Sequence, residues 1–190
     1  MASLNDLMRL FTLFLSLSLH SASLAPAPAP SLKLPSNNLL ESTCKKTREF
    51  YTLCMETLES NPETATASSP LDLAEAALKF AAEDTKIASK KLRALLKSKF
   101  TQPGLNKGFE ICVNWYDMAA RQLNMSSQEL EDPLSANYDA ALANSHESAD
   151  CENALASAGV HVPEIEAMIK RLRCFCRIAY VVTDALPQEY

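Results

Sequence analysis

Glycine and aromatic residues are scarce in this chain of 190 residues. Only 3 residues are glycine, and 7% are aromatic. Strands are enriched in aromatic and β-branched residues, so this composition argues against an all-β fold. The chain is instead rich in Ala, Leu, Glu and Lys, which are good helix formers. The composition therefore predicts an all-α protein.

The chain also lacks an excess of positive charge. It has 18 Lys and Arg residues against 23 Asp and Glu residues, for a net charge of −5. Nucleic-acid binding proteins neutralise phosphates with a basic surface, which an acidic chain of this kind does not provide. We therefore expect no nucleic-acid partner.

Motifs for catalysis and for metal binding are missing as well. The two histidines beyond the N-terminal region, His146 and His161, belong to no H-E-x-x-H or similar pattern. The sequence has neither a G-x-S-x-G elbow nor a glycine-rich phosphate loop. Acidic residues such as Glu129, Glu131 and Asp132 stand near a predicted helix start, where they normally act as caps or dipole partners. We expect no catalytic residue, no metal and no cofactor.

The chain has only one long apolar run. Residues 10–19 are apolar, follow the basic Arg9 and precede small residues at 21–25. This order predicts a secretory signal peptide over residues 1–25. The run is shorter than the roughly 20 residues of a membrane span, so we expect no membrane anchor after cleavage. Alternating Pro and Ala then predict an extended spacer over residues 26–37, followed by one folded domain over 38–187.

Six cysteines in a secreted chain are expected to be mostly oxidised, but their number alone does not give the pairing. Taken alone, Cys44 and Cys54 are compatible with metal ligands, with a catalytic thiol or with a disulfide. Cys174 and Cys176 stand two positions apart on a predicted helix, where side chains point about 200° from each other. We predict that Cys176 lies in the core and Cys174 nearer the surface, with a disulfide to another cysteine or chain as the alternative.

Helix signals recur along the rest of the chain. Ser69 is a good cap, Pro70 suits the first helical position and Asp72 stands where a reciprocal acidic partner belongs, so a long helix is predicted from there to about residue 98. A break at 102–104 separates it from a second helix, whose apolar face ends at Leu123. A last helix is predicted after Pro163.

A third long helix is predicted between these. Ser126–Glu129 has capping-box spacing, and Leu134, Tyr138, Ala141 and Leu142 are assigned to its apolar face. Two short helices at 39–47 and 50–58 precede all four. The pattern therefore predicts four main helices and a short N-terminal pair.

Two surface features remain. Asn124-Met125-Ser126 is an N-x-S sequon, which predicts glycosylation at Asn124 in a secreted protein. Lys170, Arg173 and Arg177 share a face of the last helix, which is either solvated or a contact for an acidic partner.

Sequence landmarks surround four of the cysteines in order: NNLLESTCKKT at 37–47, Tyr51 with Cys54, CVNWYDMA at 112–119, and NYDAALAN at 137–144 ahead of Cys151. These landmarks resemble the plant invertase and pectin methylesterase inhibitors over residues 37 to 186. The resemblance implies an up-and-down four-helix bundle preceded by a helical hairpin. It also implies two disulfides, Cys44–Cys54 and Cys112–Cys151.

Members of that family are not enzymes. The resemblance implies a secreted, monomeric inhibitor that covers the active-site cleft of a plant carbohydrate enzyme, in the apoplast or cell wall or else in the vacuole. The target is either an acid invertase (β-fructofuranosidase) or a pectin methylesterase. A third possibility is a secreted helical protein that uses the same scaffold to bind another partner.

The Asn-Asn-Leu-x-Glu-x-Thr-Cys opening is closer to the invertase inhibitors. Many of those carry a Pro-Lys-Phe tripeptide that enters the invertase site; here the matching stretch reads Asp132-Pro133-Leu134-Ser135. Proline is kept, but the lysine and the phenylalanine are not. We therefore predict a different contact set in this region, which comprises Asp132, Pro133, Leu134, Ser135 and Tyr138.

Overall fold

The structure is a computed structural model that describes residues 36–99, 103–144, 147–157, 159 and 163–187. These residues belong to one of the two units into which contacts divide the chain, Lys33–Tyr190. The predicted signal peptide and residues 26–35 of the predicted spacer lie outside the described residues, as do His146 and His161. The predicted domain start at residue 38 falls in the first turn of the first described helix.

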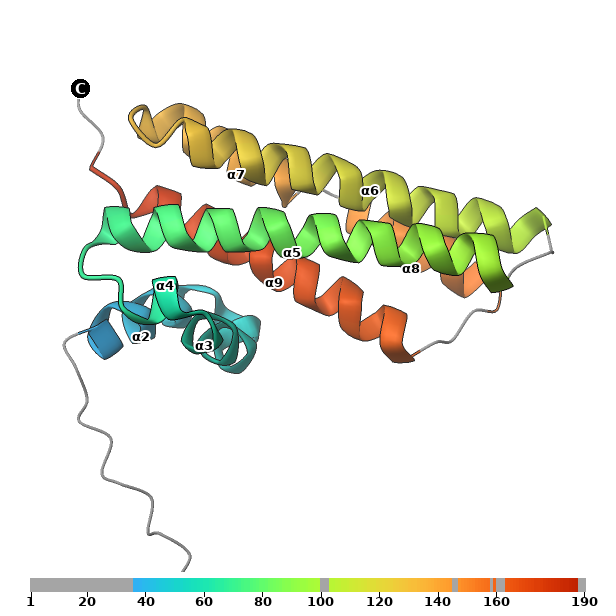
Figure 1. The fold of residues 1–190 in the computed structure, drawn as a ribbon, viewed down its shortest axis with the longest axis horizontal. Helices are drawn as coiled ribbons and strands as arrows, with labels where there is room; N and C mark the ends of the chain where they lie inside the picture. The colour runs from blue at the N-terminus through green and yellow to red at the C-terminus, as the bar shows by residue number, and fades with distance from the viewer. Residues whose placement is uncertain (1–35, 100–102, 145–146, 158, 160–162, 188–190) are drawn as a thin grey trace, which may run out of the picture. The chain divides into compact units, whose positions relative to one another are not determined.

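All regular structure in the described part of the chain is helical, which confirms the predicted class. The elements are α2 (Ser36–Lys46), the 3-10 turn η1 (Arg48–Phe50), α3 (Tyr51–Ser60), α4 (Pro62–Ala65), α5 (Pro70–Lys99), α6 (Pro103–Gln128), α7 (Pro133–Ala143), α8 (Glu147–Ser157) and α9 (Pro163–Asp184) (Figure 1).

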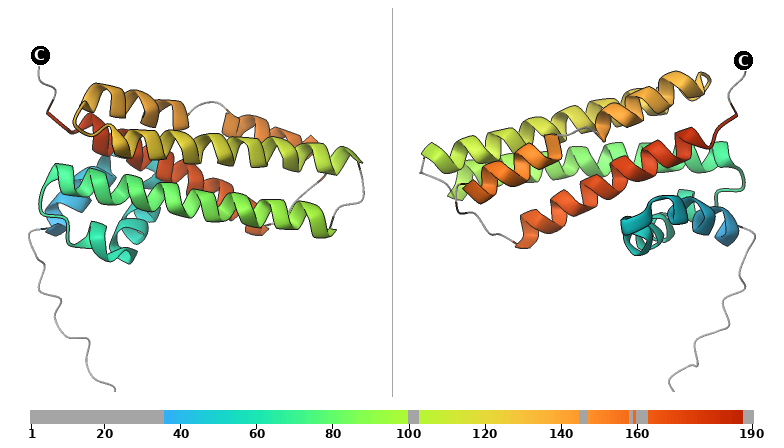
Figure 2. Two further views of the ribbon diagram at one scale, coloured as in Figure 1. Left: turned by 45° about the horizontal axis from the view of Figure 1, so that its top comes forward. Right: turned by 180° about the vertical axis from the view of Figure 1, so that it is seen from behind.

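The predicted bundle has four helical positions, which are occupied by α5, by α6, by α7 together with α8, and by α9. α5 packs on α6, α6 packs on both α7 and α8, α7 packs on α9, and α9 closes the ring against α5. Figure 2 shows α7 and α8 following one another along α6, so the third long helix is present in two pieces. The up-and-down bundle is confirmed. Besides this division, the count changes by the short helix α4, which follows the predicted N-terminal pair.

The start of α5 follows the predicted cap. The Asp72 amide donates a 3.1 Å hydrogen bond to Ser69 Oγ, as an N-cap requires. The Asp72 carboxylate accepts from the amide and hydroxyl of Ser68, so the reciprocal bond is made one residue earlier than in a capping box. One apolar side of α5 faces the core, with Leu78 and Leu92 fully buried.

The predicted helix start at Ser126 is wrong. α6 continues to Gln128, and the buried Ser126 hydroxyl donates a 2.8 Å hydrogen bond to the Ala136 carbonyl of α7. The next helix instead begins at Pro133, where Asp132 acts as the cap: one of its carboxylate oxygens accepts from the Ser135 amide. Asp132 as the cap and Pro133 at the first helical position favour a helix start there. Ser126 does not act as a cap, because it lies within α6 and its hydroxyl already has a partner.

The predicted apolar face of α7 is also wrong. Leu134 and Tyr138 are exposed, and the buried face consists of Ala136, Asp139, Ala140 and Ala143. Small residues allow α7 to lie close to α6, where a leucine would not fit. The alanine stripe therefore sets the rotation of this helix.

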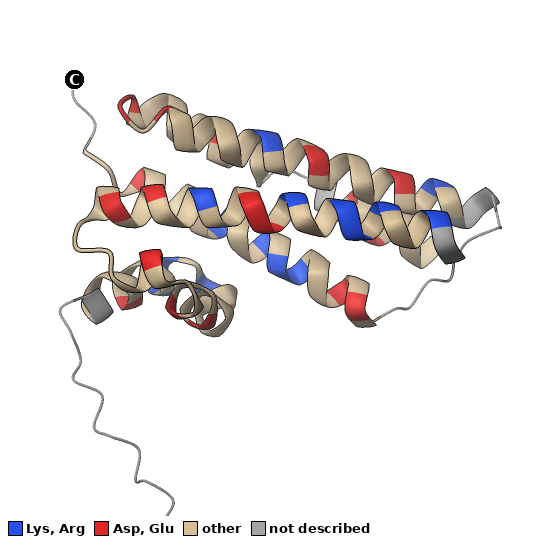
Figure 3. Cartoon of the chain, viewed as in Figure 1, with Lys and Arg blue, Asp and Glu red and all other residues tan. Residues whose placement is uncertain are grey.

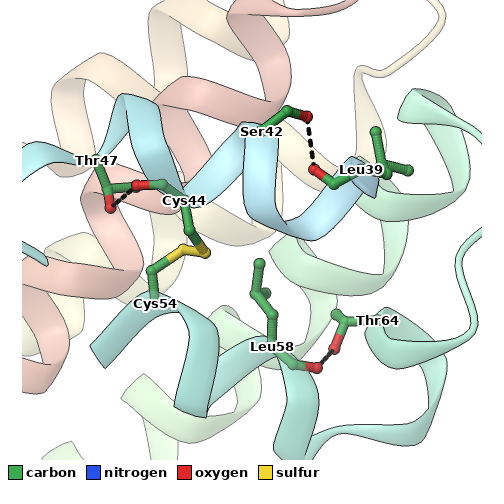
Figure 4. Close-up of a disulfide and its surroundings, with 7 residues drawn as sticks. All are labelled: Leu39, Ser42, Cys44, Thr47, Cys54, Leu58 and Thr64. Carbon is green, nitrogen blue, oxygen red and sulfur yellow. Dashed lines mark hydrogen bonds between the residues drawn. A yellow bond between two sulfur atoms is a disulfide. The ribbon is translucent and has the colours of Figure 1, made fainter. Parts of the chain in front are cut away.

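Both disulfides implied by the resemblance are present. Cys44–Cys54 joins α2 to α3 beside Leu58, and Thr47 Oγ1 donates a 2.7 Å hydrogen bond to the Cys44 carbonyl, as Figure 4 shows. The Thr64 hydroxyl donates to the Leu58 carbonyl and ties α4 to the end of α3. The predicted N-terminal hairpin is thus a closed unit, and it packs on α5 and α9.

Cys112–Cys151 joins α6 to α8, with Cα atoms 4.6 Å apart. One turn earlier on α6, a Cβ added to Gly108 would lie 3.1 Å from the Ala154 carbonyl oxygen. The absence of a side chain at Gly108 therefore allows the close approach of these two helices beside the disulfide.

Cys174 and Cys176 are both free and both fully buried. The predicted position of Cys176 is confirmed, but the prediction that Cys174 lies nearer the surface is wrong. α9 packs against α5 and α7 of the bundle and also against α2 and α3 of the hairpin. Helices of both the bundle and the hairpin therefore cover α9, and both thiols are buried among them.

Candidate partner-binding surface

The five predicted contact residues lie together at the start of α7. The turn that leads into it is closed by backbone hydrogen bonds, including a 2.8 Å bond from the Asp132 amide to the Glu129 carbonyl. Asp132 then caps the helix: its carboxylate accepts a 2.7 Å hydrogen bond from the Ser135 hydroxyl. Pro133 occupies the first helical position.

Leu134 and Tyr138 form an exposed apolar pair that we call the α7 ridge. Their exposed fractions are 66% and 64%, and among the large apolar side chains of the described residues only Ile87 is as exposed. Residues four apart on a helix are neighbours on its surface, so the two side chains present one continuous apolar strip. Tyrosine combines apolar area with a polar tip and is enriched among the residues that dominate binding energies.

Hydrogen bonds to α6 and α9 hold the backbone of the α7 ridge in place. Asn137, between its two members, donates hydrogen bonds from Nδ2 to the Tyr180 carbonyl (3.2 Å) and to Thr183 Oγ1 (3.0 Å) of α9. The bond from Ser126 to Ala136 ties the same turn of α7 to α6. Little backbone entropy would be lost when a partner contacts the ridge, which favours affinity.

Acidic residues border the ridge. Figure 3 shows acidic residues where α6 turns into α7, and the sequence places Glu129, Glu131 and Asp132 there. Hydrogen bonds from the Ser135 hydroxyl and amide lower the pKa of Asp132. The pKa of Glu129 is raised, first by burial and then by the hydrogen bond and charge of Asp139. A matching partner would therefore present apolar atoms and positively charged or neutral groups to this surface.

The predicted glycosylation residue lies on a different face. Asn124 is exposed and lines a groove of about 520 Å³ between α5 and α6, together with Lys86 and Arg121. Asp117 on the groove wall accepts a 2.6 Å hydrogen bond from the Ser89 hydroxyl and pairs with Arg93. Attachment of a glycan at Asn124 stays a prediction.

The basic face predicted on α9 is largely engaged within the protein. Arg173 pairs with Glu152 of α8 at 3.1 Å, and Arg177 donates to the Lys46 carbonyl of α2. The Arg177 guanidinium also lies 5.5 Å from the centre of the Tyr180 ring. These contacts favour the solvated, structural interpretation over an acidic-partner site.

Neither a metal site nor a membrane helix is found in the part of the chain that the structure describes. Its His, Cys, Asp and Glu residues form no group of three or more that could hold a metal ion. None of its helices is both long enough and apolar enough to cross a bilayer.

Sequence reasoning missed the roles of Asn137 and of the buried Ser126, which hold α7 in place beneath this surface. A signal was available: Ala136, Ala140 and Ala143 recur at three- and four-residue steps, which is the spacing of a buried helical stripe. Taking that stripe as the core face would have placed Leu134 and Tyr138 outside.

The described residues thus form a disulfide-linked helical bundle with an exposed apolar pair on α7. Comparison with known proteins gives the family: the profile for "Plant invertase/pectin methylesterase inhibitor" matches residues 38–182, so the chain belongs to this family. The family's members are proteinaceous inhibitors.

Two solved structures share the fold. A mutant form of a pectin methylesterase inhibitor from Arabidopsis is 20% identical, with a TM-score of 0.68, and the match covers 79% of this chain and 98% of that one. A pectin methylesterase inhibitor from Arabidopsis thaliana is 19% identical, with a TM-score of 0.58 and coverage of 80% and 98%. No match was found among the curated proteins.

Proposed function

We propose that the chain is a secreted inhibitor of a plant acid invertase (β-fructofuranosidase) and that the α7 ridge enters the active-site cleft of that enzyme. The observation that carries this proposal is the exposure of Leu134 and Tyr138 directly after the Asp132–Pro133 cap. This is the place where many invertase inhibitors have Pro-Lys-Phe. The protein acts as a monomer in the apoplast or cell wall, with the vacuole as the alternative compartment.

The ridge has the properties of a binding hot spot. Burying a large apolar side chain contributes about 1.5–3 kcal/mol, and the few residues that dominate an interface each cost about 2 kcal/mol or more when truncated. Leu134 and Tyr138 stand on a turn that Asn137 holds to α9. Binding would then require neither refolding nor reorientation of α7.

The second candidate target is a pectin methylesterase. It is favoured by the replacement of lysine and phenylalanine by Leu134 and Ser135, since the invertase-type anchor is then incomplete. Both solved structures described above carry the name of pectin methylesterase inhibitor, and they share this fold.

The test is an inhibition assay with the oxidised, secreted protein at about pH 5 against an acid invertase and a pectin methylesterase in parallel. Loss of sucrose cleavage supports the leading proposal. Loss of pectin demethylation alone assigns the second target. If neither enzyme is inhibited by folded protein, the chain has another partner and both proposals fail.

The contribution of the ridge is tested with a matched pair of variants. Leu134 and Leu71 are each the second residue of a helix that begins with proline, and both are exposed. Leu134→Ala and Tyr138→Ala should each weaken inhibition about 30-fold, the equivalent of about 2 kcal/mol. Leu71→Ala should leave inhibition unchanged. Equal effects of Leu134→Ala and Leu71→Ala would mean that α7 is not the contact surface.

A further inference from the structure

A cavity of about 200 Å³ lies between α5, α6 and α9, and it is partly open to solvent beside the exposed Ile87. Its inner residues are Thr85 of α5, Tyr116 of α6, and Leu172 and Phe175 of α9. Figure 1 shows these three helices side by side along the bundle. The lining residues come from α5, α6 and α9, so the cavity is separate from the α7 ridge.

Two buried hydroxyl groups of this cavity have no hydrogen-bond partner. Thr85 and Tyr116 are each only 1% exposed, and neither hydroxyl has a partner among the residues that the structure describes. A buried polar group left unsatisfied costs about 1–3 kcal/mol, so such groups normally bind something. That both belong to one cavity points to a shared ligand rather than to two separate defects.

The remaining wall is mostly apolar. Ala88, Met168, Leu172 and Phe175 supply aliphatic and aromatic surface around the two hydroxyls. A buried apolar cavity of about 150 Å³ is large enough for benzene. A cavity of this size therefore accommodates a six-membered ring with one small substituent.

The charged groups at the cavity argue for a neutral ligand. Arg171 makes two 3.0 Å hydrogen bonds to the Asp84 carboxylate, and its guanidinium lies 4.9 Å from the centre of the Phe175 ring. Lys91 is paired with Glu164. Both cations are thus already neutralised, and Asp84 would repel an anion. Burial, with the nearby Cys176 and Asp84, raises the pKa of Tyr116, so its hydroxyl stays protonated and can donate.

We propose that this cavity is a binding site for a small neutral molecule that carries a hydroxyl group on a six-membered ring, with Tyr116 and Thr85 as its hydrogen-bond partners. The ring packs against Leu172, Met168 and Phe175. A ligand hydroxyl both donates and accepts, so it suits either protein hydroxyl as a hydrogen-bond partner. The shared chemistry fits an aromatic phenol or an alicyclic alcohol. The site does not depend on which enzyme the protein inhibits.

The experiment titrates the folded, oxidised protein with four probes and follows its amide NMR spectrum. Phenol and cyclohexanol represent the two ligand sources, toluene lacks the hydroxyl, and benzoate adds a negative charge. We expect saturable shifts in α5, α6 and α9, with phenol or cyclohexanol binding at least about tenfold more tightly than toluene or benzoate. Whichever alcohol binds more tightly identifies the source.

Variants separate hydroxyl recognition from simple filling of space. The pair Tyr116→Phe and Thr85→Val keeps the side-chain volume, so the combined variant should fold, bind toluene and lose the preference for phenol over toluene. Ala88→Leu narrows the cavity and should weaken the binding of all four probes. The α-helical spectrum and the melting temperature of this variant show whether it is folded.

Three results would overturn the proposal. One is the absence of saturable binding by phenol and cyclohexanol at millimolar concentration, which would mean that the hydroxyls bind water only. Another is equal affinity for toluene and phenol in the natural protein. The third is a preference for phenol that survives in the Tyr116→Phe, Thr85→Val variant.

Discussion

The Ser126 hydroxyl of α6 donates a 2.8 Å hydrogen bond to the carbonyl oxygen of Ala136 in α7, and both residues are fully buried. This bond crosses the turn that carries the acidic cap of α7. Together with the bonds from Asn137 to α9, it fixes the rotation of α7 that leaves Leu134 and Tyr138 exposed. A side chain that resembles a helix cap in the sequence thus acts as a link between two helices.

Replacing Ser126 with alanine should lower the free energy of unfolding by about 0.5–1.5 kcal/mol, because the buried hydrogen bond to the Ala136 carbonyl is lost. Urea denaturation of unglycosylated protein measures the change. Ser126→Ala also destroys the sequon, so Asn124→Gln is the control: it removes the sequon but keeps the buried bond, and should change stability by less than about 0.5 kcal/mol. Equal stability of the two variants would contradict the assigned role of Ser126.

Gly108→Ala should destabilise the protein although alanine is the better helix former by about 1 kcal/mol. The new Cβ would lie 3.1 Å from the Ala154 carbonyl oxygen, and the Cys112–Cys151 bond one turn away prevents α8 from moving aside. Thermal unfolding gives the sign. Asn114→Ala, at an exposed position of α6, should be neutral or slightly stabilising. A higher melting temperature for Gly108→Ala would show that α8 can move enough to make room for the new Cβ.

Cys174 and Cys176 should not react with iodoacetamide in the native protein at pH 8. Burial raises the pKa of each thiol to about 12, so the reactive thiolate is scarce as well as inaccessible. Mass spectrometry should find both residues alkylated only after unfolding in guanidinium. Rapid native labelling of either cysteine would show that α9 separates readily from the helices that cover it.

Glu129→Gln should stabilise the protein more at neutral pH than at acidic pH. The pKa of Glu129 is raised above 4.5, mainly by burial and further by Asp139, so the fold favours the protonated carboxyl. The stability contributed by that proton is fully present below pH 4.5 and is lost as the pH rises through the raised pKa. Glutamine resembles the protonated form at every pH.

Urea denaturation at several pH values from about 4 to 7 measures this difference. The two proteins should be nearly equal at the acidic end, and the variant should become the more stable one as the pH rises. Asp139→Asn is a second check, since it removes the neighbouring charge and should reduce the same pH dependence. If the free energy of unfolding of Glu129→Gln differs from that of the natural protein by the same amount at every pH, the titration of Glu129 does not affect stability and the prediction is wrong.

The sequence predicted those parts of the fold that local chemistry decides. The start of α5 was predictable because Ser69 and Pro70 suit the cap and the first turn, whatever the rest of the chain does. The bundle followed from helical periodicity, and the two disulfides from the family resemblance. The place of the proposed contact residues also came from that resemblance, and it stays a prediction.

Long-range contacts decided the rest. Ser126 and Asp132 both have cap-like surroundings, and only the bond from Ser126 to Ala136 shows which one begins a helix. Hydropathy alone assigned Leu134 to the core, but close packing on α6 admits alanine there instead. The burial of Cys174 depends on helices from distant parts of the sequence that pack around α9.

The Cys112–Cys151 bond spans 39 residues, and the whole of α7 lies within that span. The ridge therefore stands on a covalent ring that runs from α6 to α8. One peptide-bond cut by an extracellular protease in the exposed turn before Pro133 would leave the two fragments still joined through sulfur. Such a nicked chain keeps Leu134 and Tyr138 attached to the bundle, so the same bond that joins two helices also prevents the proposed binding surface from being released.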